Sequence, residues 1–262
     1  MTATATTSPA PSHEAGPTGP APSRRLRRLS RAAGVLYLAI FVIYPLAVAV
    51  RSTLVVPGDA ATTAANIAAD ETLFRWGLAG ESAVVLIEVL LAGVLYALLR
   101  PVSRAGSLAA ALARVAEAVV MAAGPIAAGV VTLVLVGGGG YLAAFEPDQR
   151  DALVMVFQEA NDGMVLVWGF FFGLSLVLTG WLVHRSGFLP RLPGVLLALA
   201  GAAYLLQSFG TFVAPGAADL WDAVVLVAAI PGELVFALWL LVRGVDADRW
   251  AAAADRARDA RV

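Results

Sequence analysis

The chain has 262 residues, of which 60% are hydrophobic and only 14% charged, and its mean hydropathy is +0.80. A soluble domain carries about 25% charged residues, so this composition favours a membrane protein. The net charge of −1 argues against a nucleic-acid partner, and the lack of cysteine excludes disulfides. Two histidines are too few for a bis-histidine haem or a histidine-rich zinc site, so we expect neither metal nor cofactor.

The N-terminal segment is rich in Ser, Thr, Pro, Ala and Gly up to about residue 23 and has almost no apolar bulk. Such a segment cannot bury enough surface to offset the entropy of ordering. We predict a disordered cytoplasmic tail over 1–28, a transmembrane domain over 29–245 and a charged cytoplasmic tail over 246–262.

Six apolar runs then reach the length of about 20 residues that a transmembrane helix needs. They cover Ala32–Val50, Trp76–Leu99, Ser107–Val136, Gly163–Val183, Pro193–Val213 and Ala223–Val242. The runs are continuous rather than alternating, which excludes barrel strands. The predicted fold is therefore all-α, a bundle of six transmembrane helices.

The placement of arginine predicts the orientation of the bundle. Fourteen arginines flank the spans on one side, and only Arg51, Arg75 and Arg150 lie on the other. By the positive-inside rule both termini are cytoplasmic, which an even number of spans also requires. We expect a multi-pass protein of a bacterial cytoplasmic membrane.

Two outer loops carry helix-start signals. Pro57, Gly58 and Asp59 read as a turn and an N-cap that open a helix through Ile67. Glu146, Pro147 and Asp148 place proline and acids at the first turn of a second helix, over 147–160. We interpret both as short connecting helices, with a lid over the bundle as the alternative.

Ionisable side chains lie inside the spans, where they are costly and mark function or pairing. They are Glu81, Glu88, Glu117 and Glu233, with Arg114 as the single basic residue within a predicted span. Glu88 and Glu233 fall near the membrane midplane, and Pro231 and Gly232 should kink or loosen the last helix beside Glu233.

One arginine cannot neutralise four acids, so we expect some carboxyls to be protonated or to hold a cation. Arg114 either snorkels to the cytoplasmic interface, pairs with Glu88, Glu117 or Glu233, or contacts a ligand. The acids either lock helix packing as neutral hydrogen-bonding groups or bind a proton, a small cation or an amine.

Further polar residues gather where the predicted fourth span begins on the outer side. Gln158, Glu159, Asn161 and Asp162 precede it, and Gln207 lies toward the same side of the fifth span. With Glu81 they could rim an outward-facing cavity, although a solvated helix start explains them equally well. Gly169 and Gly173 form a small-xxx-small pattern, repeated by Gly194, Ala198 and Ala202, which we read as helix packing.

Several segments together resemble a bacterial family of multi-pass membrane proteins that is catalogued only as a domain of unknown function. The likeness extends from about Arg27 to Val245. It rests on Ala33–Phe41, Val56–Ala61, Asn66–Ile67, Leu73–Arg75, Phe171–Leu174, Arg185–Arg191, Glu233–Leu234 and Trp239–Leu240. The resemblance implies about six membrane helices and supplies no activity and no site residues.

The leading functional hypothesis is a non-enzymatic membrane protein that binds or moves a small cationic or protonatable solute, with Glu81, Glu88 and Glu233 as a relay. The first alternative is a structural or regulatory partner protein in which the acids only lock helix packing. For either function the expected partners are the lipid bilayer, a small cation or amine, and further copies of the chain in a homo-oligomer. A lipid-modifying enzyme is the weakest alternative, because the chain shows no Walker loop, HExxH or GxSxG motif and no visible nucleophile–base pair.

Overall fold

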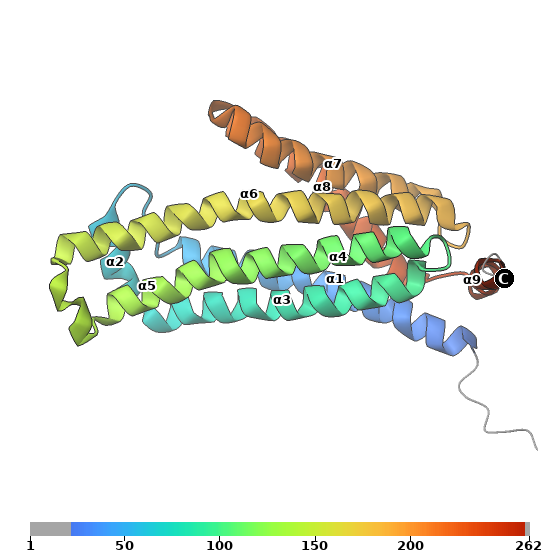
Figure 1. Cartoon of the computed structure of the whole chain (residues 1–262), viewed down its shortest axis with the longest axis horizontal. Helices are drawn as coiled ribbons and strands as arrows, with labels where there is room; N and C mark the ends of the chain where they lie inside the picture. Colours follow the sequence, from blue (N-terminus) through green and yellow to red (C-terminus); the bar gives the residue numbers. More distant parts are fainter. Residues whose placement is uncertain (1–21, 260–262) are drawn as a thin grey trace, which may run out of the picture.

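The computed structural model describes residues 22–259, and all the regular structure in this range is helical (Figure 1). Six of its helices are long and apolar enough to cross a membrane, which confirms the predicted all-α fold with six spans. The predicted disorder of residues 1–21 lies outside the described residues. Residues 22–28, which were also assigned to the tail, are instead helical, because Leu26 packs into the core with an exposed fraction of 5%.

The helices follow one another with short connections. Their bounds are α1 Pro22–Ser52, α2 Ala60–Ala69, α3 Glu71–Leu99, α4 Arg104–Met121, η1 Ala122–Ile126, α5 Ala127–Gly137, η2 Gly140–Ala144, α6 Pro147–Ser186, α7 Arg191–Val213, η3 Pro215–Ala217, α8 Ala218–Val242 and α9 Ala247–Asp259. The segments α4, η1 and α5 form one span, in which a π-helical turn contains Pro125. That turn absorbs the backbone hydrogen bond that proline cannot donate.

The predicted helix starts are confirmed at both of these loops. Asp59 caps α2, and its Oδ1 accepts a hydrogen bond from the Thr62 amide at 2.9 Å. Glu146 caps α6 in a capping box, with Pro147 at the first helical position. The prediction of a separate helix over 147–160 is wrong, because α6 runs unbroken for 40 residues. A lone glycine such as Gly163 costs only about 1 kcal/mol in a helix and does not end it.

Small residues bring α6 and α7 into backbone contact, as the sequence predicts. A Cβ atom added at Gly173 would lie 2.7 Å from the carbonyl oxygen of Gly201, and one at Gly194 would lie 2.7 Å from the amide nitrogen of His184. Close approach of this kind is how membrane helices gain packing energy where no hydrophobic drive is available. The α7 residue that contacts Gly173 is Gly201, whereas the sequence pattern predicted Ala202.

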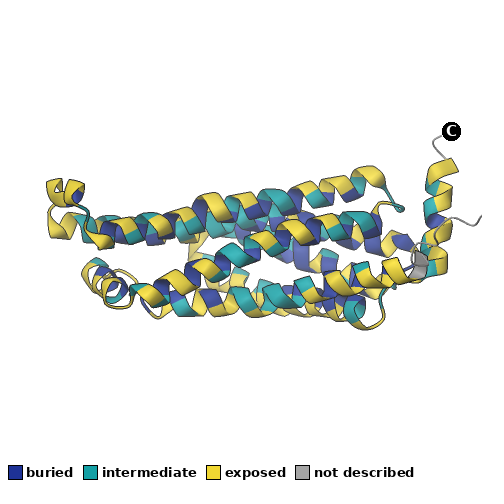
Figure 2. Cartoon of the chain, turned by 90° about the horizontal axis from the view of Figure 1, so that it is seen from below, coloured by how far each residue is buried: buried dark blue, intermediate teal, exposed yellow. Residues whose placement is uncertain are grey.

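Helices α1, α3, α4 and α6 form the body of the bundle, and α7 and α8 pair along one side of it (Figure 1). Buried residues lie on the helix faces turned toward one another, and exposed residues lie on the outer faces (Figure 2). The outer faces are apolar: Val42, Leu86, Leu226 and Val213 are 62–85% exposed. Such surfaces suit contact with the hydrocarbon of a bilayer.

The two ends of the bundle differ in charge. We call one the arginine-rich end: it holds the start of α1, the α3–α4 and α6–α7 connections and α9, which lies across the bundle direction (Figure 2). The opposite end, with α2, η2 and the start of α6, is the acidic end, and the α7–α8 turn at η3 lies toward it, part of the way along α6 (Figure 1). The first described helix and α9 therefore lie at the same end, as six spans require.

Candidate functional site

Arg114 forms the centre of a buried cluster in the middle of the bundle. Its Nη1 donates a hydrogen bond to Glu88 Oε2 at 2.7 Å, its Nη2 donates to Tyr37 Oη at 3.2 Å, and its Nε lies 3.4 Å from Ser175 Oγ. These partners come from α3, α1 and α6, so one guanidinium connects four helices. We call Tyr37, Glu88, Arg114, Glu117, Ser175 and Glu233 the buried cluster.

The guanidinium of Arg114 is also sandwiched by aromatic rings. Its carbon lies 5.0 Å from the ring centroid of Tyr37 and 5.4 Å from that of Phe172. The residue is only 1% exposed, so the interpretation that it snorkels to the interface is wrong. Pairing with Glu88, the structural alternative, is what the structure shows, because the carboxylate and the two rings satisfy the charge without water.

Glu117 packs against Glu88 in the buried cluster. It is fully buried, and its carboxyl group lies within hydrogen-bonding reach of the Glu88 carboxyl group. Glu233 on α8 faces the same groups and interacts with Arg114, Glu88 and Tyr204. Two ionised carboxylates in contact are prohibitively costly at this depth, so Glu117 is either neutral and donates to Glu88 or is matched by a bound cation.

A second buried network lies nearer the acidic end. Arg51 Nη1 donates to both carboxyl oxygens of Glu81, at 2.7 and 2.9 Å, and its Nη2 donates to Gln158 Oε1 at 3.3 Å. Gln158 Nε2 donates in turn to Thr132 Oγ1 at 2.8 Å. Arg51 is 7% exposed, so its assignment to the outer loop is wrong, and the expectation of one arginine for four acids is corrected to two.

Beside this network lies a cavity of ≈ 620 Å³, which we call the acidic cavity. Five of its lining residues are the predicted mouth residues Gln158, Glu159, Asn161, Asp162 and Gln207, and Glu81 is a sixth. Asp222 adds a further carboxylate, and Tyr44 and Trp168 add aromatic walls. The structure thus brings together residues that are up to 178 positions apart, from Tyr44 on α1 to Asp222 on α8.

Two hydrogen bonds connect the polar side chains at this cavity. Gln207 Nε2 donates to Asp222 Oδ1 at 2.7 Å, which joins α7 to α8, and Asn161 Nδ2 donates to Asp162 Oδ1 at 3.1 Å. Asp222 was not among the predicted site residues, because it precedes the predicted sixth span and resembles an ordinary acid at a helix start.

Aromatic side chains separate the acidic cavity from the buried cluster. Trp168 lines the cavity and stacks on Phe172 with ring centroids 4.6 Å apart. Tyr44 lies 6.2 Å from Trp168, and Tyr204 meets it edge-on at 5.8 Å. The predicted site residues therefore fall into two groups, Glu81 with the mouth residues and Glu88, Glu117, Glu233 and Arg114 with the buried cluster.

The two groups approach each other along α4. Met121 lines the acidic cavity, and Glu117 lies four residues earlier, one helical turn deeper on the same face. Among residues 22–259 no group of three or more His, Cys, Asp or Glu side chains is arranged to hold a metal ion. The acidic cavity therefore presents carboxylates, amides and aromatic rings around a space large enough for a small molecule.

Six apolar spans with lipid-suited outer faces and a polar interior define a multi-pass α-helical membrane protein. The chain belongs to the family described as a domain of unknown function, DUF4386, whose model matches residues 32–244. It is also similar to an uncharacterized protein of Archaeoglobus fulgidus, with 26% identity over 170 residues that cover 64% of this chain and 84% of the relative. No solved structure matches the chain.

Proposed function

We propose that the protein binds a small cationic or protonatable solute in the acidic cavity, as a non-enzymatic membrane protein. The observation that carries the proposal is the charge of the lining: Glu81, Glu159, Asp162 and Asp222 face one arginine, Arg51. Because Arg51 is already paired with Glu81, the other three carboxylates are left to attract a cation. Low-dielectric walls strengthen such an attraction.

The aromatic walls support an organic cation as the solute. Tyr44 and Trp168 present ring surface to the cavity, and an ammonium group over such a ring gains cation–π energy. Met121 and Met155 add soft apolar surface that adapts to different shapes. An amine with a small apolar group would use both features, whereas a metal ion would use neither.

The buried cluster gives the proposal a proton-accepting group below the cavity. Glu117 lies one turn beneath Met121, beside the carboxyl group of Glu88. We propose that it changes protonation when a cation enters the cavity, and that Glu233 shares this role. The arginine-rich end is assigned to the cytoplasm of a bacterial cell by the positive-inside rule, so the acidic cavity would face outward.

The alternative of a structural or regulatory protein is favoured by a specific observation. Glu81 and Glu88, two members of the predicted relay, are both ion-paired and tie α3 to α1 and α4. Their contribution is then to helix packing, which predicts that Glu→Gln is tolerated and that Glu→Leu destabilises. The proposal accordingly places ligand contacts on Asp162, Asp222 and Glu159 rather than on these two.

Isothermal titration of the purified full-length protein tests the proposal, with benzylamine as the cationic probe and benzyl alcohol as its uncharged analogue. We expect benzylamine to bind and benzyl alcohol to bind much more weakly. The double substitution Asp162→Asn/Asp222→Asn should weaken benzylamine binding about tenfold or more, since two nearby charges are lost. Asparagine keeps the Oδ1 acceptor for Gln207, so the α7–α8 hydrogen bond is retained.

Asp148→Asn/Asp219→Asn is the matched control, because it removes two exposed acids of the same end that do not line the cavity. Equal loss of affinity in both double variants would show that diffuse charge alone attracts the probe. Equal affinity for benzylamine and benzyl alcohol would also refute the proposal, and the structural alternative would then stand.

A further inference from the structure

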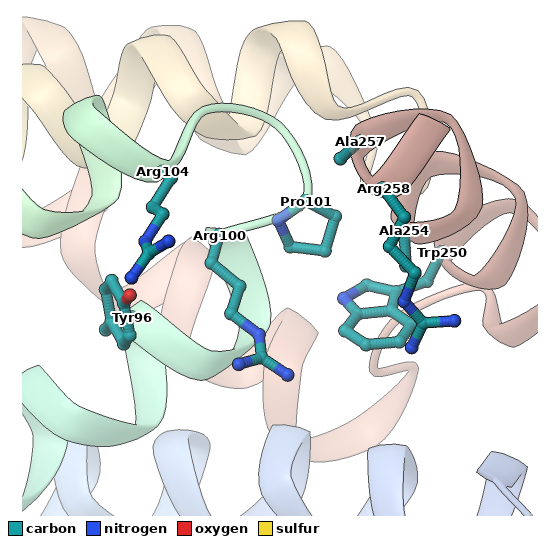
Figure 3. A pocket seen from close by; sticks show the side chains of 8 residues that line it. All are labelled: Tyr96, Arg100, Pro101, Arg104, Trp250, Ala254, Ala257 and Arg258. Carbon is teal, nitrogen blue, oxygen red and sulfur yellow. The ribbon is translucent and has the colours of Figure 1, made fainter. Parts of the chain in front are cut away.

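A cavity of ≈ 260 Å³ at the arginine-rich end lies between the α3–α4 connection and α9 (Figure 3). It is lined by Tyr96, Arg100, Pro101, Arg104, Trp250, Ala254, Ala257 and Arg258. Three of these eight side chains are arginines, and none is acidic. We call it the arginine pocket; it plays no part in the function proposed above.

The arginines of this pocket are available for an anion. Neither Arg100 nor Arg104 forms an ion pair within residues 22–259, and Arg258 has only the exposed Asp255 at 3.2 Å. Figure 3 shows Arg100 between Arg104 on one side and Arg258 with Trp250 on the other. Arg104 is also the first residue of α4, whose helix dipole adds positive potential at the same place.

Helix α9 is amphipathic and packs its apolar face against the end of the bundle. Trp250, Ala253, Ala254 and Ala257 form one face of it and are buried or half-buried, while its charged side chains are exposed. Trp250 Nε1 donates to the carbonyl oxygen of Leu98 at 2.8 Å, which fixes α9 against the end of α3. Tryptophan and tyrosine are enriched at the level of lipid headgroups, where Trp250 and Tyr96 flank this pocket.

We propose that the arginine pocket binds the phosphate group of an anionic phospholipid, with Arg100 and Arg104 as its principal contacts and Trp250 at the glycerol level. A membrane phospholipid is favoured over a soluble phosphate compound because the pocket lies where an apolar bundle ends and an amphipathic helix begins. Guanidinium groups match phosphate oxygens in geometry and charge. The site would hold α9 to the bundle through a lipid.

Native mass spectrometry of the delipidated full-length protein tests this proposal by titration with phosphatidylglycerol, phosphatidylcholine and glycerol 3-phosphate. We expect one phosphatidylglycerol to bind more tightly than the other two. Arg100→Gln/Arg104→Gln should weaken its binding roughly 30-fold, given the usual gain per arginine near an anionic lipid. Arg100→Lys/Arg104→Lys should keep most of the affinity, because it keeps both charges.

Arg191→Gln/Arg256→Gln is the matched control, with two exposed arginines of the same end that do not line the pocket. It should change the affinity less than twofold. Equal weakening in the two glutamine variants would overturn the proposal in favour of diffuse attraction. Binding of glycerol 3-phosphate as tight as that of phosphatidylglycerol would overturn it in favour of a soluble ligand, and a lack of preference for phosphatidylglycerol would overturn it outright.

Discussion

Replacing Arg114 with methionine should destabilise the protein strongly, and more so at high pH. Methionine has similar length and no charge, so Glu88 loses its 2.7 Å partner and stays buried. Breaking one half of a buried ion pair costs about 3–5 kcal/mol. Protonation of Glu88 sets an upper limit to this cost. Protonating a glutamate of ordinary pKa, near 4.3, requires about 5 kcal/mol at pH 8 and about 2 kcal/mol at pH 6.

The sign of the pH dependence follows from proton uptake. The variant must bind a proton at Glu88 to fold, whereas the unfolded chain at pH 6–8 does not, so its stability falls as the pH rises. With a shift of about 2–4 °C in Tm per kcal/mol for a chain of this size, we expect a loss of roughly 10–20 °C at pH 8 and about half of that at pH 6.

Thermal unfolding in a neutral detergent at pH 6 and pH 8 measures both quantities. Arg75→Met is the control, because Arg75 pairs with Glu71 on an exposed helix surface, where such pairs contribute about 0–1 kcal/mol. Arg114→Met/Glu88→Met should lose the pH dependence. A deficit for Arg114→Met that is no larger than that of the control, or that is the same at both pH values, would refute the reasoning.

Three further outcomes are expected. Gly194→Ala should cost about 1–3 kcal/mol in unfolding free energy, because its Cβ would lie 2.8 Å from the carbonyl oxygen of Gly180; an unchanged Tm contradicts this. Glu117→Gln should leave Tm nearly unchanged if Glu117 is neutral in the folded protein, whereas a large loss would reveal an ionised, matched carboxylate. Hydrogen bonds from Thr62 lower the pKa of Asp59, so its cap acts above the ordinary aspartate range and is lost as the pH falls through the lowered value. Asp59→Ala should therefore speed amide exchange in α2 at neutral pH and not in strong acid.

The spans were predictable because each is a long apolar run, and hydropathy alone identifies such runs. The lengths of the helices could not be predicted in the same way, because polar residues at the ends of a span are compatible with both helix and loop. Arg51 shows the consequence: it closes α1 and reads as a flanking charge, yet Glu81 at matching depth on α3 draws it into the protein. The sequence signal for this ion pair is an arginine and a glutamate at similar depths on neighbouring spans.

Helix rotation and tilt determine the polar residues that share a cavity. Neither can be derived from a single sequence. The mouth residues Gln158, Asn161 and Asp162 could be grouped because they are close in sequence and on one side of the membrane. Asp222 could not, because its position beside Gln207 depends on how α7 and α8 pair. The contact between the carboxyl groups of Glu117 and Glu88 likewise depends on how α3 and α4 pack, with Arg114 turned toward Glu88.

The unbroken length of α6 sets the depth of the acidic cavity. Forty residues rise about 60 Å, which exceeds both the hydrocarbon core of about 30 Å and the 40–45 Å that includes the headgroups. With Ser186 at one interface, Asp162 lies about 36 Å further along the helix axis, at the level of the opposite headgroups. The carboxylates of the cavity mouth therefore lie at the membrane–water interface, where a charged solute can contact them before it is dehydrated.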